Sequence, residues 1–129
     1  MSRTIGYAAH SATTALESFP FDRREPLAGD VEIDILYCGV CHSDLHTARS
    51  EWPGTVYPVV PGHEIVGRVS RVGGGAQGFA PGDLAAVGCM VDSCGTCQDC
   101  REGLEQYCQS FPTLTYNSPD KHLGSMTYG

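Results

Sequence analysis

Four cysteines that lie close together within residues 94–108 constrain this chain more than any other feature. Cys94, Cys97, Cys100 and Cys108 follow the spacing C-x2-C-x2-C-x7-C. Zn²⁺ binds four ligands tetrahedrally, and a chain that returns a thiolate every third residue can direct several sulfurs to one point. Four cysteine ligands leave no open position for water or substrate. The spacing therefore predicts a structural zinc site.

Two other structures use cysteines at similar spacing. A [4Fe–4S] cluster uses a C-x2-C-x2-C run, but proline typically follows its distant cysteine, whereas Gln109 follows Cys108 here. Paired disulfides belong to exported proteins, yet the first residues lead into no signal peptide and the seven cysteines are an odd number. Zinc is therefore the favoured ligand of the cluster.

The charge balance excludes some classes of partner. The 129 residues carry 15 acidic and 8 basic side chains, for a net charge of −7, whereas a phosphate backbone or an anionic membrane attracts a basic face. The residues near the cysteines are acidic too, which disfavours a nucleic-acid-binding zinc ribbon: Asp92, Asp99, Glu102 and Glu105. No apolar run approaches the roughly 20 residues that span a bilayer. We expect a cytoplasmic protein that binds neither nucleic acid nor membrane.

The hydrophobic pattern predicts a mainly β fold in one domain. Residues 31–37 alternate between apolar and acidic side chains, which is typical of a half-buried strand, and strands are also expected at 63–72 and 84–87. Residues 43–50 resemble a short helix that Ser43 caps. Gly73–Gly75 is predicted to be a turn and not a phosphate-binding loop, because a strand and not a helix follows it. Cys38 and Cys89, which have apolar neighbours, are expected to be buried thiols.

A second group of polar residues lies around residues 41–46 and 63–64. Cys41 and His63 could supply a thiolate and an imidazole to a metal, although two protein ligands do not close a tetrahedral site. Asp44 could orient the His63 ring, and Ser43 and His46 share a helix face on which they could pass a proton.

Structural roles for the same residues remain open on spacing alone. A cysteine such as Cys41 is often merely buried, and His63 could be a histidine with a purely structural hydrogen bond. Ser43 fits a helix cap, Glu64 a solvated carboxylate, and Trp52 a core side chain.

The motifs taken together resemble the zinc-dependent medium-chain alcohol dehydrogenases. The segments that carry the resemblance are Tyr37 to His46 (YCGVCHSDLH), Tyr57 to Gly67 (YPVVPGHEIVG), Pro81 to Asp83 (PGD) and the four-cysteine cluster. Within that family the chain is most similar to the cinnamyl alcohol dehydrogenase branch, including bacterial NADP-dependent aldehyde reductases. The similarity runs from about residue 3 to the end.

The resemblance implies a GroES-like, partly open β-barrel with short helices and a zinc-binding lobe at about residues 89–112. Cys41 and His63 would be ligands of a catalytic zinc, and Glu64 would be the adjacent carboxylate that can approach the metal. The structural zinc would be bound by Cys94, Cys97, Cys100 and Cys108.

The family also assigns roles to the residues around these ligands. Ser43 would donate a hydrogen bond to the substrate oxygen, and His46 would be the far end of a proton relay through the coenzyme ribose. His42 would contact the coenzyme pyrophosphate, Asp44 would orient a metal ligand, and Trp52 would line the pocket for an aromatic or medium-chain aldehyde.

The resemblance implies an oxidoreductase that transfers hydride between NADP(H) and a small alcohol or aldehyde. Residues 1–129 would be its catalytic domain, without the Rossmann domain, the third protein ligand of the catalytic zinc and the final strands of the barrel. We therefore expect the chain to be inactive alone and to self-associate. The alternative is a stand-alone zinc-stabilised module for protein interaction.

Overall fold

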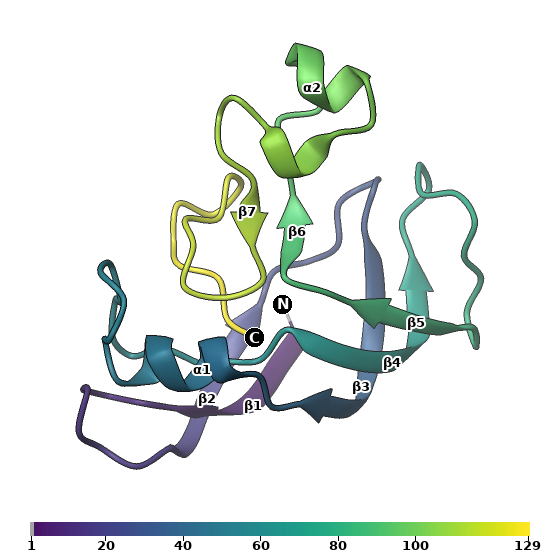
Figure 1. Ribbon diagram of the computed structural model, residues 1–129. Helices are drawn as coiled ribbons and strands as arrows, with labels where there is room; N and C mark the ends of the chain where they lie inside the picture. Colours follow the sequence, from purple (N-terminus) through teal and green to yellow (C-terminus); the bar gives the residue numbers. More distant parts are fainter. Residues whose placement is uncertain (1) are drawn as a thin grey trace.

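The computed structural model describes residues 2–129, and strands make up most of its regular structure (Figure 1). The elements in chain order are β1 (Ser2–Ala8), β2 (Glu17–Arg23), β3 (Val31–Gly39), α1 (His42–Ala48), β4 (Glu64–Val72), β5 (Leu84–Val87), β6 (Met90–Asp92), α2 (Gln98–Arg101), the 3₁₀ turn η1 (Glu105–Tyr107) and β7 (Thr113–Leu114). The prediction of a mainly β chain is confirmed. None of the described helices is long and apolar enough to cross a membrane.

The strands form three separate antiparallel sheets. β1 pairs with β2, β3–β4–β5 form the central sheet, and β6 pairs with β7. No barrel closes among residues 2–129, in agreement with the expected open architecture. The short β6–β7 pair leads away from the central sheet into a lobe that contains α2 and η1 (Figure 1).

The central sheet confirms the strands expected at 31–37, 63–72 and 84–87, with small shifts at their ends. The predicted half-buried face of the first strand is only partly correct. Ile35 and Tyr37 are 47% and 75% exposed, because register shifts between Glu32 and Ile33 and between Ile35 and Tyr37 interrupt the alternation.

β1 and β2 are among the elements that were not predicted, because each has only two alternating apolar side chains, Ile5 and Tyr7 in β1 and Phe19 and Phe21 in β2. β1 and β2 pair along their full length, and β2 contains Pro20 opposite Ile5. Proline cannot donate a ladder hydrogen bond, so it fits an edge strand such as β2.

The predicted helix exists, but the prediction that Ser43 caps it is wrong. The N-cap of α1 is Cys41 and not Ser43, and the Asp44 carboxylate accepts a 2.8 Å hydrogen bond from the Cys41 backbone N–H. The expectation that Cys38 and Cys89 are buried is also wrong, because both are exposed. Their apolar sequence neighbours therefore did not indicate burial.

A small core joins three distant segments of the chain. Ala9, Val59 and Tyr116 are almost fully buried against one another, with Ala48 and Tyr57 packed around them. Ala9 and Val59 exchange two backbone hydrogen bonds of 2.9 and 3.0 Å. The loop that precedes β4 is therefore attached to the end of β1.

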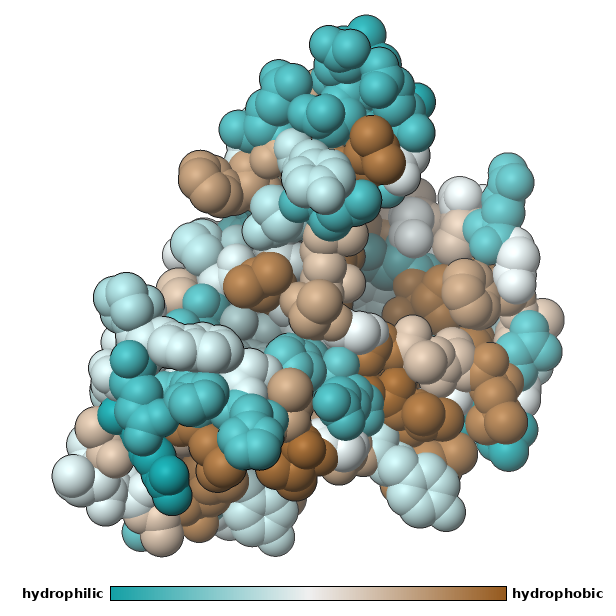
Figure 2. Space-filling model, viewed as in Figure 1, coloured by the Kyte–Doolittle hydropathy of each residue, from teal (hydrophilic) through white to brown (hydrophobic). Residues whose placement is uncertain are grey.

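Apolar side chains also remain on the surface. Figure 2 shows a hydrophobic area over the part of the molecule that contains β3, β4 and β5. A groove of about 1130 Å³ adjoins β3 and α1, and its lining includes Ile5, Ile35, Val40 and Leu45. Val40 is 80% exposed.

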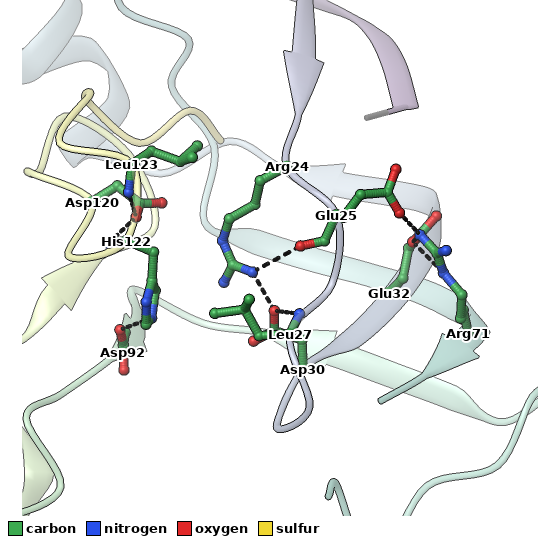
Figure 3. A network of polar contacts seen from close by, with 10 residues as sticks. All are labelled: Arg24, Glu25, Leu27, Asp30, Glu32, Arg71, Asp92, Asp120, His122 and Leu123. Carbon is green, nitrogen blue, oxygen red and sulfur yellow. Dashed lines mark hydrogen bonds and ion pairs between the residues drawn. The ribbon is translucent and has the colours of Figure 1, made fainter. Parts of the chain in front are cut away.

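Polar contacts tie the segment before β3 to the rest of the molecule (Figure 3). Arg24 pairs with Asp30, and Arg71 on β4 reaches Glu32 at 2.6 Å. Exposed ion pairs of this kind contribute little to stability because solvent screens them, so they orient the segment more than they stabilise the fold.

We predict that Gly67→Ala destabilises the central sheet. A β-carbon at Gly67 would lie 2.7 Å from the Asp34 carbonyl oxygen on the neighbouring strand. Overpacking of this kind costs about 1–3 kcal/mol, so the unfolding midpoint in urea should fall. Gly74→Ala is the control, because nothing lies within 4 Å of a β-carbon there. Equal midpoints for the two variants would contradict the close packing of β3 against β4.

Candidate functional site

The four cysteines of the lobe converge on one point. Their sulfurs all lie within 4.8 Å of one another, and the Cys94 and Cys100 sulfurs are 3.9 Å apart. A tetrahedral site with Zn–S bonds of about 2.3 Å places its sulfurs about 3.8 Å apart. The donor set and its spacing fit Zn²⁺. Within residues 2–129, no other group of three or more such side chains is gathered in this way.

The backbone of the lobe is shaped to stabilise thiolates. The Cys97 N–H donates to the Cys94 sulfur at 3.3 Å, and the Cys94 N–H donates to the Cys108 sulfur at 3.4 Å. The backbone N–H groups of Thr96 and Cys97 lower the pKa of the Cys94 thiol to about 5. Gly95, with a φ of +66°, supplies the turn between these donors.

Cys100 shows the opposite behaviour. The Ser93 hydroxyl, 3.4 Å from its sulfur, favours the thiolate, but burial and the neighbouring thiols Cys97 and Cys108 outweigh it. They raise the pKa of Cys100 to about 11. Crowded sulfurs resist joint ionisation unless a cation neutralises them. All seven cysteines are free thiols, so no disulfide competes for these ligands.

A second group of polar side chains surrounds the first turn of α1. The Ser43 hydroxyl lies 3.0 Å from His63 Nε2, which joins residues twenty positions apart. Cys41 is half-buried at the N-cap of the same helix. The Glu64 carboxylate lies against Gly39, two residues before Cys41, where a β-carbon would be 2.5 Å from its oxygen. The structure thus brings His63 to α1, and among the described residues it does not gather Cys41, His63 and Glu64 as tightly as the four cysteines of the lobe.

Asp44 is buried beneath α1 with one carboxylate oxygen unpartnered among the described residues. Its Oδ2 binds the Cys41 backbone, whereas Oδ1 has no hydrogen-bond donor. A buried acceptor without a donor costs about 1–3 kcal/mol. Asp44 therefore orients the Cys41 backbone, and its second oxygen remains free to accept from a ring N–H.

His46 lies at the outer end of this group. Its Nδ1 is 2.5 Å from the Glu51 carboxylate, and its ring stacks on Trp52 at a centroid distance of 4.8 Å. The His42 ring lies 6.2 Å from the His46 ring. Glu51 was not identified from the sequence. Ser50, with a φ of +54°, turns the chain so that the Glu51 N–H binds the His46 carbonyl.

Tyr116 is a second residue that the sequence did not reveal. It is 6% exposed, and its ring lies 5.2 Å from the His63 ring. Burial, together with the nearby Asp44 carboxylate, raises the pKa of its phenol to about 12, although the Ser43 hydroxyl opposes this shift. Tyr116 follows β7 and lies far from residues 41–64 in sequence, so no local spacing pointed to it.

The fold has a counterpart in a known domain family. The family model "Alcohol dehydrogenase GroES-like domain" matches residues 27–128. The chain belongs to this family.

The chain is similar to several named reductases and dehydrogenases. Aldehyde reductase YahK of Escherichia coli (strain K12) is 62% identical over 94% of this chain and 34% of its own length. A cinnamyl alcohol dehydrogenase of Sorghum bicolor superposes with a TM-score of 0.94 at 45% identity, over 99% of this chain and 36% of that one. The CAD of Helicobacter pylori complexed with NADP(H) superposes with a TM-score of 0.93 at 41% identity, over 98% of this chain and 37% of that one. The chain spans about a third of the length of these relatives.

We predict that the lobe binds close to one zinc ion per chain and that Cys100→Ser releases it. The loss of one of four thiolates opens a closed shell, and structural zinc contributes on the order of 10 kcal/mol to a small folding unit. Cys89→Ser is the control because Cys89 is exposed and outside the cluster. Elemental analysis measures the metal. Iron in place of zinc, or disulfides among the four cysteines, would contradict the assignment.

Proposed function

We propose that this chain is the catalytic domain of a zinc-dependent alcohol dehydrogenase or aldehyde reductase that transfers hydride between NADP(H) and a small alcohol or aldehyde. The observation that carries the proposal is the 3.0 Å contact between the Ser43 hydroxyl and His63 Nε2 beside Cys41. A hydroxyl and an imidazole in contact, beside a helix whose N-cap residue carries a thiol, are groups suited to bind a metal and move a proton. Membership in the family supports the same conclusion.

Cys41 and His63 would provide two ligands of the catalytic zinc. A thiolate and an imidazole suit Zn²⁺, and the remaining positions would be filled by Glu64, by substrate or by a ligand from outside residues 1–129. When bound, zinc polarises a carbonyl oxygen or lowers the pKa of an alcohol. Asp44 would hold Cys41 through its backbone and orient the His63 ring through its free oxygen.

Ser43 and His46 would move the proton. In the direction of aldehyde reduction, the Ser43 Oγ–H would donate to the carbonyl oxygen as the carbon receives hydride. The hydroxyl would regain its proton from His46 through the coenzyme ribose. Glu51 binds His46 Nδ1 and so leaves Nε2 as the atom for proton transfer.

His42 would contact the coenzyme, and Trp52 would contact the aldehyde substrate. His42, next to Ser43 on α1, would lie at the coenzyme pyrophosphate. Trp52 is 50% exposed and stacks on His46, so its free face would form a wall for an aromatic or medium-chain aldehyde. A Rossmann domain outside residues 1–129 would supply the rest of the coenzyme site, and the chain alone would be inactive.

The alternative of a stand-alone zinc-stabilised interaction module would explain the lobe and the exposed apolar residues. It would leave the contact between Ser43 and His63 and the pairing of His46 with Glu51 without a role. An open reading frame that continues past codon 129 into a strand and a G-x-G-x-x-G turn would exclude it.

We predict that Ser43→Ala lowers kcat/KM for aldehyde reduction by about 10²–10⁴-fold in the product of the intact reading frame, because it removes the proton donor. The assay follows oxidation of NADPH, and of NADH, with cinnamaldehyde and zinc-replete protein. Ser110→Ala, an exposed serine outside the site, is the control. Unchanged activity in Ser43→Ala would contradict the proposal, and activity of residues 1–129 alone would contradict the need for a second domain.

We also predict that residues 1–129 alone self-associate through the exposed apolar side chains of β3, which include Tyr37. Exposed apolar side chains next to unpaired strand edges promote association. Light scattering should give a mass above 13.8 kDa, and Tyr37→Lys should lower it. Leu123→Lys, which changes another exposed apolar residue, should not. A strictly monomeric chain would remove this argument.

A further inference from the structure

Arg23 at the end of β2 directs its guanidinium to main-chain oxygens of Tyr128 and Gly129. Its Nη1 donates to the Tyr128 carbonyl at 2.8 Å, and its Nη2 donates to the Gly129 carbonyl at 2.9 Å. The guanidinium also lies 4.8 Å above the Phe21 ring. Within residues 2–129 it forms no ion pair. The planar guanidinium of an arginine can bind two successive carbonyls and so fix the path of the chain. The single ammonium group of a lysine does this less well.

The segment that Arg23 binds is also anchored by its own side chain. The Tyr128 ring packs edge-on against Phe21 at 4.9 Å and against Phe19 at 5.8 Å. Residues 128–129 are therefore held against β2 by two hydrogen bonds and an aromatic cluster. We call residues 128–129 the strap.

The strap lies directly on the turn that precedes His63. The Gly129 N–H donates to the Val60 carbonyl at 2.9 Å. A β-carbon at Gly129 would lie 2.3 Å from the Gly62 carbonyl oxygen and 2.8 Å from the Pro61 carbonyl carbon. Only glycine allows the two backbones to approach so closely.

A second close contact confines the turn. Gly62 is buried with a φ of +127°, and a β-carbon there would lie 2.8 Å from the Cys38 sulfur. Glycine has more backbone freedom than any other residue, so Gly62 would let the next residue swing unless its surroundings fixed it. The close contacts of Gly62 with Cys38 and with Gly129 restrict it and so set the direction of His63.

We propose that Arg23 is a positioning residue that clamps the strap onto residues 60–62 and thereby places the His63 ring against Ser43. The chain of contacts runs from the guanidinium through the Tyr128 and Gly129 carbonyls, across the hydrogen bond between Gly129 and Val60, to Gly62 and His63. The clamp follows from the geometry alone, whereas its importance for metal binding rests on the proposed function.

Arg23→Met in the product of the intact reading frame tests the clamp, because methionine retains apolar packing and removes both donors. In metal-free protein, amide hydrogen exchange at Gly129 and at residues 60–63 should become about tenfold faster. In Co²⁺-loaded protein, the visible absorption from the site of Cys41 and His63 should weaken, and cobalt should be lost to a chelator about 10–100-fold faster.

Arg24→Met is the matched control. Arg24 is the adjacent arginine and carries the same charge, but it pairs with Asp30 in the network of Figure 3 and does not contact the strap. Both readouts should remain at the wild-type level in this variant. Arg23→Lys, with a single point of donation, should give intermediate values, and Gly129→Ala should reproduce the effect of Arg23→Met from the other side of the contact.

Two results distinguish a clamp on His63 from a general loss of stability and from a failure of the proposed function. If Arg23→Met and Gly129→Ala lower only the unfolding midpoint and leave exchange at residues 60–63 and the cobalt spectrum unchanged, the proposal is overturned. If the wild-type protein shows no cobalt absorption from Cys41 while Arg23→Met still accelerates exchange, the clamp is supported and the proposed metal role of His63 fails.

Discussion

The pair of backbone hydrogen bonds between Ala9 and Val59 holds the parts of this molecule in register. It fixes the end of β1 to the loop before β4, and Tyr116 closes the small core from a third segment. His63 lies four residues after Val59 and next to the Tyr116 ring, so its position depends on this junction. The polar groups around α1 are consequently built from residues that meet only when the core forms.

The lobe is organised by different physics. Its sulfurs are arranged by backbone N–H donors and tight turns, and few apolar side chains are buried near them. A unit of this size gains little from hydrophobic burial, and a metal bound by four thiolates can replace a core. The molecule therefore combines a region held by backbone pairing and apolar contact with a region held by ligands.

Local sequence patterns predicted the parts whose structure is decided locally. The spacing of the four cysteines led directly to a cluster that the structure assembles, and the alternation in 31–37 and the apolar run in 63–72 predicted β3 and β4. The patterns failed where distant residues decide the outcome. Register shifts in β3 exposed Tyr37, β1 and β2 depend on pairing with each other, and Tyr116 reaches His63 only in the folded chain. Glu51 depends on a left-handed residue, Ser50, that no spacing rule reveals.

The way in which the lobe is attached has an evolutionary consequence. The chain enters the lobe through β6 and leaves it through β7, which pair as Met90 with Leu114, and the Thr115 N–H binds the Cys89 carbonyl at 3.1 Å. Entry and exit therefore lie side by side, so the chain leaves the body of the fold and returns to it at one place. A lineage could shorten or replace residues 93–112 by bridging one narrow gap, so the metal-binding excursion can be exchanged as a unit while the arrangement around α1 is preserved.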